Sequence, residues 1–227
     1  MAQTIHLPVR CYQAPTAVTF ACEPSRTALL LVDCNGDQMP GCFGPVKRDC
    51  IAPVLQMARR IGIRPVYLFQ SGYGTGGPMD VVRTLVEPTL RADDWQPTIP
   101  EYGPEIAPMA GEAILPKVHQ DAFQGSHVDY YLRTWGIDTI LVVGFYLECC
   151  VYQTCLGARL RNYRVILLRD CTSPPGASED RRSVDPANPE GGWVRWVFLS
   201  MHEKLVGPTS TSAEFHAACA AADAKSP

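Results

Sequence analysis

Three residues of types that take part in catalysis, Asp33, Lys117 and Cys150, stand at or just beyond the ends of apolar segments. A carboxylate in such a place can act as a general base, an ammonium can stabilise negative charge, and a thiol can act as a nucleophile. Each type taken alone is more often structural, because carboxylates cap turns and most lysines lie on surfaces. Their shared position nevertheless predicts one cleft that holds an acid/base, a cation and a nucleophile.

Cys150 is the strongest of these candidates. The segment 144–154, GFYLECCVYQT, leads from an apolar run through a tight turn into a helical pattern that begins near Cys150. A thiol at a helix N-terminus lies near unpaired N–H groups and the positive end of the helix dipole, and both lower its pKa. Cys34, Cys155 and Cys171, by contrast, are expected to be buried hydrophobic residues.

The elements that must position these residues are short apolar strands. Continuous apolar runs are typical of parallel strands that helices cover on both faces. The predicted strands span residues 27–32, 65–69, 113–116, 139–143, 164–168 and 204–207. The predicted helices span residues 47–61, 127–135, 150–162, 193–202 and 211–222. This alternation predicts an α/β fold of three layers, doubly wound around a mostly parallel six-stranded sheet.

The whole alternation fits one domain over residues 27–227, and a chain of 227 residues is long enough for one sizeable core. Residues 1–26 are expected to form an irregular N-terminal arm, because three prolines interrupt any regular element there. Two long connections, 71–111 and 172–192, leave the C-terminal ends of strands, where ligands bind in open α/β sheets. Connections of this length usually contain lids, substrate loops or oligomer contacts.

A glycine-rich segment suggests a different chemistry. Residues 72–77, GYGTGG, match the dinucleotide fingerprint G-x-G-x-x-G, which would indicate a nicotinamide-dependent oxidoreductase. The context does not fit, because the segment follows the second strand and no predicted strand carries Asp93 or Asp94 to a ribose. We therefore interpret residues 72–77 as a flexible loop and keep the oxidoreductase as an alternative.

Composition excludes several classes of protein. Twenty Lys and Arg residues against 23 Asp and Glu residues give a net charge of −3, which provides no basic surface for nucleic acid or an anionic membrane. No apolar run approaches the roughly 18 residues of a membrane span, and the N-terminal sequence MAQTIHLPVRCYQAP lacks the apolar core of a signal peptide. The ten cysteines are scattered rather than dense. We expect a cytoplasmic protein with reduced thiols that binds neither nucleic acid nor membrane.

Four segments together carry a family resemblance. LLVD at 30–33 is similar to a first-strand motif with a catalytic Asp, and PK at 116–117 is similar to a lysine segment. ECCVYQT at 148–154 is similar to a nucleophile turn, and RVILLRD at 164–170 matches the strand that follows. In their order and spacing, these segments resemble the isochorismatase-like cysteine hydrolases across roughly residues 25–215.

The resemblance implies a catalytic triad of Asp33, Lys117 and Cys150, with Cys150, directly before a valine, as the nucleophile. It implies a cis peptide bond between Phe145 and Tyr146, which turns a backbone N–H into the cleft. The backbone N–H groups of Tyr146 and Cys150 are then the expected oxyanion hole.

The resemblance also bears on substrate, cofactor and assembly. The phrase DCT at 170–172 and the N-terminal arm are similar to family members that act on ureides and carbamoyl compounds such as ureidoacrylate, biuret or triuret. Asn35, Tyr146 and His202 are the candidate substrate-binding residues. The metal-binding branch uses an Asp-x-His and a further His, a set that the five histidines do not provide, so we expect no metal and no cofactor. A homo-oligomer, dimer or tetramer, is implied by the resemblance alone.

These observations predict a cysteine-dependent amidohydrolase that cleaves a C–N bond of a small amide or ureide. Cys150 would carry a covalent acyl intermediate and Asp33 would act as the general base. The alternatives are a catalytically inactive member used as an interaction module, and the oxidoreductase suggested by residues 72–77.

Overall fold

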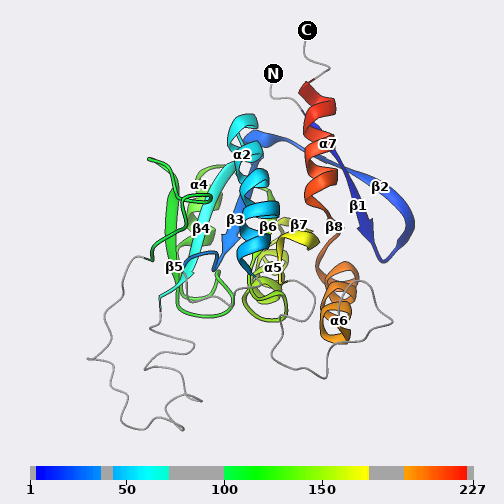
Figure 1. Cartoon of the computed structure of the whole chain (residues 1–227). Coiled ribbons are helices and arrows are strands. Elements are labelled where there is room, and N and C mark those ends of the chain that lie inside the picture. The colour runs from blue at the N-terminus through cyan, green and yellow to red at the C-terminus, as the bar shows by residue number, and fades with distance from the viewer. Residues whose placement is uncertain (1–3, 37–42, 72–99, 174–191, 224–227) are drawn as a thin grey trace.

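The computed structural model describes residues 4–36, 43–71, 100–173 and 192–223. The described part contains one sheet of eight strands in the order β2-β1-β8-β7-β6-β3-β4-β5 (Figure 1). The parallel strands are β3 (Thr27–Val32), β4 (Arg64–Gln70), β5 (Ala113–Lys117), β6 (Thr139–Gly144), β7 (Arg164–Leu168) and β8 (Thr209–Ser210). Five of these six lie where the apolar runs predicted them, so the α/β, mostly parallel fold is confirmed.

The expectation of an irregular N-terminal arm is wrong. β1 (Ile5–Cys11) and β2 (Ala14–Cys22) form an antiparallel hairpin, and β1 pairs with β8, which extends the sheet from six strands to eight. A short 3₁₀ turn, η1 (Pro24–Arg26), leads into β3. Prolines are compatible with this hairpin because β2 is an edge strand and β1 meets β8 through a single residue pair, Arg10 with Thr209.

The predicted strand at 204–207 is also wrong. These residues belong to a π-helical turn, η7 (His202–Val206), that continues directly from α6 (Trp193–Met201). Leu199, His202 and Val206 are buried, and their spacing of three and four residues is that of a helix face. The sixth parallel strand is instead β8, two residues long, just after this turn.

Helices cover both faces of the sheet, which gives the predicted three layers (Figure 1). One face carries α1 (Phe43–Val46), the π-helical turn η2 (Lys47–Ile51), α2 (Ala52–Ile61) and α7 (Ser212–Asp223). The other carries α4 (Val128–Thr134), the π-helical turn η4 (Leu147–Val151), α5 (Tyr152–Leu160) and α6. Among the described residues, no helix is long and apolar enough to span a membrane.

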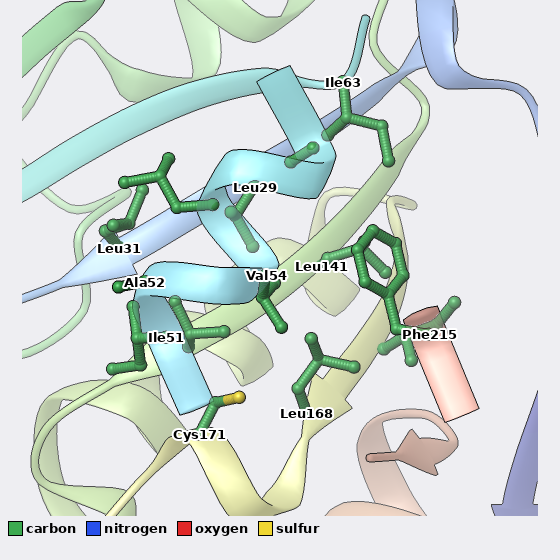
Figure 2. Close-up of a cluster of buried hydrophobic side chains, with 14 of the residues drawn as sticks. Leu29, Leu31, Ile51, Ala52, Val54, Ile63, Leu141, Leu168, Cys171 and Phe215 are labelled. Carbon is green, nitrogen blue, oxygen red and sulfur yellow. The ribbon is translucent and has the colours of Figure 1, made fainter. Parts of the chain in front are cut away.

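The central strand β3 explains why the sequence is apolar without alternation. All six of its residues are buried, with Leu29 and Leu31 facing α2 and with Leu30 facing the α4–α5 layer. Figure 2 shows the first of these two clusters, which contains Leu29 and Leu31 of β3 together with side chains of the covering helices such as Val54 and Phe215. Because both faces are packed, the ends of the strands are fixed relative to one another.

The end of β6 depends on one glycine. Gly144 has φ +120°, a conformation that side chains rarely adopt, and a Cβ there would collide with the carbonyl oxygen of Val32 on β3. The next residue, Phe145, donates its N–H to the same oxygen at 2.9 Å. Gly144 therefore allows the chain to leave β6 pressed against the end of β3, where Asp33 begins.

Candidate active site

Four strands end at the same edge of the sheet and present polar side chains there. Asp33 follows β3, Gln70 ends β4, Lys117 ends β5, and Cys150 lies in η4 after β6. Asp33 has φ +49°, and its N–H donates to the carbonyl oxygen of Leu68 at 2.8 Å, so the β3–β4 ladder continues up to this residue. Parallel strands expose their C-terminal ends at one edge, and this geometry brings the side chains together.

Lys117 is the centre of the cluster. Its Nζ lies 2.9 Å from Asp33 Oδ2 and 3.3 Å from Cys150 Sγ. It also donates to Gln70 Oε1 at 2.7 Å and to the carbonyl oxygen of His119 at 3.4 Å. Because β5 pairs with β4, and β4 with β3, the lysine side chain reaches across the end of β4 to its partners. The structure therefore brings together the three residues that the sequence singled out.

The Lys117 ammonium is completely buried. Burial alone disfavours the charged form, but the Asp33 carboxylate and the Cys150 sulfur outweigh it and raise the pKa of Lys117. The lysine consequently remains a cation at neutral pH. A cation in contact with the sulfur stabilises negative charge on it.

Cys149 and Cys150 form a hydrogen-bonded pair of half-buried thiols. The bond to Cys150 and the charge of Lys117 lower the pKa of Cys149 to about 7. The bond to Cys149, burial and the Asp33 carboxylate raise the pKa of Cys150. The ionisation of one thiol therefore depends on the other. Lys117 contacts the Cys150 sulfur, so it stabilises the negative charge that forms there once the Cys150 thiol loses its proton.

The turn that carries the thiols is held from two sides. The peptide bond between Phe145 and Tyr146 is cis, as the resemblance implies. The N–H of Leu147 donates to Ser173 Oγ at 2.9 Å, and the N–H groups of Cys149 and Val151 both donate to the carbonyl oxygen of Tyr146 at 3.1 Å. These bonds fix the backbone on both sides of the adjacent cysteines.

Thr154 connects the turn to the lysine segment. Its buried hydroxyl accepts the N–H of Ala122 and donates to the carbonyl oxygen of Gln120, both at 3.2 Å. Four residues after Cys150, in the first turn of α5, the chain is therefore hydrogen-bonded to the loop that follows Lys117. This contact gives a physical reason for a threonine at this place in the motif.

A cleft of about 850 Å³ opens beside the cluster. Asp33 and Cys150 line it, as do the predicted substrate-binding residues Asn35 and Tyr146. The segment 100–104 forms another part of the wall. The size suits a small molecule.

His202 is not brought to this cleft. Its side chain is completely buried in η7, and burial lowers its pKa to about 4. The residue after this turn, Gly207, packs against Val165 near the start of β7, whereas the cleft lies beyond the C-terminal strand ends. His119, close to Lys117 in sequence, contributes its backbone carbonyl to the lysine.

Sequence reasoning missed two residues of the site. Gln70 follows the predicted strand 65–69 directly, so the argument that found Asp33 and Lys117 applies to it as well. Tyr102 belongs to the long connection 71–111, where nothing in the sequence distinguishes it.

The glycine-rich residues 72–77 lie outside the described residues, as does most of the connection 172–192.

The other described cysteines and the possible metal ligands bear on two further questions, disulfide formation and metal binding. Cys34, Cys155 and Cys171 are buried in the core, as predicted, and burial raises the pKa of each. None of the nine described cysteines forms a disulfide. Within the described ranges, no group of three or more His, Cys, Asp and Glu side chains is arranged to hold a metal ion.

Comparison with known proteins shows the family of this chain. Residues 27–196 match the isochorismatase domain, so the chain belongs to the isochorismatase family. The match includes Asp33, Lys117 and Cys150 and covers the sheet from β3 to the first residues of α6.

Among curated relatives, a ureidoacrylate amidohydrolase (RutB) of Serratia proteamaculans is 28% identical over 202 residues, which covers 76% of this chain and 77% of that protein. A crystal structure of a cysteine hydrolase from Pseudomonas syringae pv. phaseolicola is similar, with TM-score 0.71 and 23% identity over 95% of this chain and 98% of the other. N-carbamoylsarcosine amidase from Thermoplasma acidophilum has TM-score 0.59 and 25% identity, and the alignment covers 82% of this chain and 96% of the other. Relatives of this chain are thus amidohydrolases.

Proposed function

We propose that the protein hydrolyses a C–N bond of a small amide or ureide through a covalent acyl intermediate on Cys150. The observation that carries the proposal is the buried Lys117 ammonium in contact with both the Asp33 carboxylate and the Cys150 sulfur. Since both groups contact the same ammonium, the carboxylate and the sulfur lie within two hydrogen-bond lengths of each other. A nucleophile, a base and a cation at this spacing suit acyl transfer.

Acylation begins when Asp33 accepts the thiol proton of Cys150, while Lys117 stabilises the thiolate. The sulfur attacks the carbonyl carbon of the substrate, and the carbonyl oxygen takes up negative charge. We assign the backbone N–H groups of Tyr146 and Cys150 to that oxyanion, each worth about 3–4 kcal/mol of the barrier. Asp33 then passes its proton to the leaving nitrogen, the C–N bond breaks, and a thioester or thiocarbamate remains on Cys150.

In deacylation, water takes the place of the thiol as the nucleophile. Asp33 accepts a proton from water, the hydroxide oxygen attacks the acyl carbon, and the carbon–sulfur bond breaks to release the acid. The Cys150 thiolate takes up the proton that Asp33 holds, which returns the site to its starting state. Lys117 remains charged throughout, in agreement with its raised pKa.

The names of the relatives support a carbamoyl-type substrate. One relative is a ureidoacrylate amidohydrolase and another an N-carbamoylsarcosine amidase, and both names describe hydrolysis of a group attached through a carbamoyl carbon. Asn35 and Tyr146 line the cleft and are proposed to contact the substrate. The expected homo-oligomer stays a prediction.

The experiment is an assay for released ammonia with a panel of ureides, carbamates and primary amides. Wild-type protein should release ammonia from at least one ureide, and Cys150→Ala should reduce the rate by a factor of 10³ or more. Cys149→Ala is the matched control, since it removes the neighbouring thiol, and it should keep measurable turnover. Absence of turnover across the whole panel, in folded wild-type protein, would favour the inactive interaction module.

A further inference from the structure

Three residues that line the active-site cleft each carry a buried oxygen atom with no hydrogen-bond partner among the described residues: Asp33 Oδ1, Asn35 Oδ1 and Tyr102 Oη. Asp33 Oδ1 is the oxygen that does not contact Lys117. Buried polar atoms in folded proteins are nearly always hydrogen-bonded, and orphaned ones are destabilising. Three such atoms around one cleft indicate that a ligand completes their bonding.

The wall that holds Asn35 is fixed. The next residue, Gly36, donates its N–H to the carbonyl oxygen of Glu101 at 2.9 Å, which joins the loop after β3 to the segment that carries Tyr102. Lys47, itself buried, donates from Nζ to the carbonyl oxygen of Gly36 at 3.3 Å. Both halves of this wall therefore keep their relative position without help from a ligand.

The Tyr102 ring is positioned by packing against a second aromatic ring. It packs edge-to-face against Tyr67, with ring centroids 5.1 Å apart and planes at 75°. The Tyr67 hydroxyl accepts a hydrogen bond of 2.9 Å from Arg59, which also donates to Glu112 and to the carbonyl oxygen of Ala107. Burial raises the pKa of Tyr102, so its hydroxyl stays protonated and can donate as well as accept.

We propose that Tyr102 and Asn35 bind the acyl side of the substrate, and that the substrate is an uncharged carbamoyl amide of the type –CO–NH–CO–NH₂ rather than a ureido acid. The inference rests on the proposed function. The Tyr102 hydroxyl donates to the second carbonyl oxygen, and Asn35 Oδ1 accepts from an N–H of the same planar unit. Asp33 Oδ1 faces the leaving nitrogen.

Charge supports this choice. Glu101 is a further acidic residue among those that line the cleft. The charge of Asp33 is balanced by Lys117, whereas Glu101 would repel a substrate that carries its own carboxylate. Glu101 is exposed, so its effect is screened by salt and is the smaller part of the discrimination.

The test compares biuret, which is uncharged, with 3-ureidopropanoate, which is an anion. We expect wild-type kcat/KM to be at least tenfold higher for biuret. Tyr102→Phe removes only the hydroxyl and should lower kcat/KM for biuret tenfold or more, while 3-ureidopropanoate changes by less than threefold. Tyr130→Phe, at an exposed position on α4, is the matched control and should leave both values unchanged. A preference of the wild type for 3-ureidopropanoate, or an equal loss for both probes in Tyr102→Phe, overturns the inference.

A binding measurement separates this inference from the proposed function. In the Cys150→Ser variant, calorimetry should show biuret binding that weakens tenfold or more when Tyr102→Phe or Asn35→Ala is added. If binding follows this pattern while the wild type hydrolyses neither probe nor any other compound of the ureide and amide panel, recognition stands and the proposed reaction fails. If the wild type hydrolyses either probe while Tyr102→Phe and Asn35→Ala leave biuret binding unchanged, the reaction stands and the recognition fails.

Discussion

The ammonium of Lys117 lies 2.9 Å from the carboxylate of Asp33, and no part of the lysine is exposed to solvent. A buried ion pair contributes little net stability, because removing two charges from water offsets their attraction. The pair is explained better by its effect on Cys150: the same ammonium contacts the Cys150 sulfur at 3.3 Å and can stabilise negative charge on it.

Breaking this pair should destabilise the protein and abolish its activity. Lys117→Met leaves the Asp33 carboxylate buried without its cation, and we expect the free energy of unfolding to fall by about 3–5 kcal/mol. Urea denaturation measures this change. In the double variant Asp33→Asn/Lys117→Met, stability should recover by more than half while turnover stays absent. Turnover in either variant at more than a hundredth of the wild-type rate would show that the pair is only structural.

The cysteine pair predicts how thiol reactivity depends on pH. The pKa of Cys149 is lowered to about 7 by its bond to Cys150 and by Lys117, so the first thiolate of the pair forms as pH rises through about 7. Alkylation of the pair by iodoacetamide should therefore be half-maximal near pH 7, below the value near 8.5 of an ordinary thiol. Because the bond to Cys149 raises the pKa of Cys150, Cys149→Ala should lower the pH at which Cys150 itself is alkylated, whereas Cys149→Ser keeps a hydrogen-bond partner and should lower it less. Identical midpoints in all three proteins would mean that the pair is not coupled.

His202 should make stability depend on pH. Burial lowers its pKa from 6.5 to about 4, so the unfolded chain binds a proton in this range that the folded chain does not. The contribution is fully present above pH 6.5 and is lost as pH falls toward 4, by roughly 3 kcal/mol in total. Thermal unfolding of His202→Gln between pH 4 and 7 should show a shallower slope than the wild type. His6→Gln, at an exposed position on β1, should keep the wild-type slope.

Gly144 should not tolerate a side chain. A Cβ there meets the carbonyl of Val32 in a backbone conformation unsuited to L residues, so Gly144→Ala should lower the free energy of unfolding by about 2–4 kcal/mol. Gly44→Ala is the control, because a Cβ at Gly44 on α1 has no neighbour within 4 Å, and it should be neutral or slightly stabilising. Chemical denaturation of both variants checks the difference, and equal stabilities would refute the account of the β6 end.

The sequence predicted the parallel core well because strands buried on both faces are continuous apolar runs. β3 and β6, with every residue buried, are the clearest cases. The N-terminal hairpin is harder to predict: β1 does alternate, with Ile5, Leu7 and Val9 buried, but the prolines in and around the hairpin obscure this period of two. β8 has only two residues, too few for any periodicity.

The candidate site was predictable where residue type and strand end coincide, as at Asp33 and Lys117. Tyr102 was not, because its place in the cleft depends on packing against Tyr67 and on a loop whose course no local pattern specifies. His202 lies apart from the cleft residues because the segment predicted as a strand is a helical turn, and its side chain is on the buried face of that turn.

The most direct test of the central claim measures how the labelling of Cys150 relates to the loss of activity. Protein is treated with iodoacetamide at pH 6 for increasing times, and each sample is divided between peptide mass spectrometry and the ammonia assay. We predict that the fraction of activity lost equals the fraction of Cys150 alkylated, that substrate slows both equally, and that the buried Cys34, Cys155 and Cys171 stay unlabelled. Full activity in protein whose Cys150 is completely alkylated would contradict the assignment of this sulfur as the nucleophile.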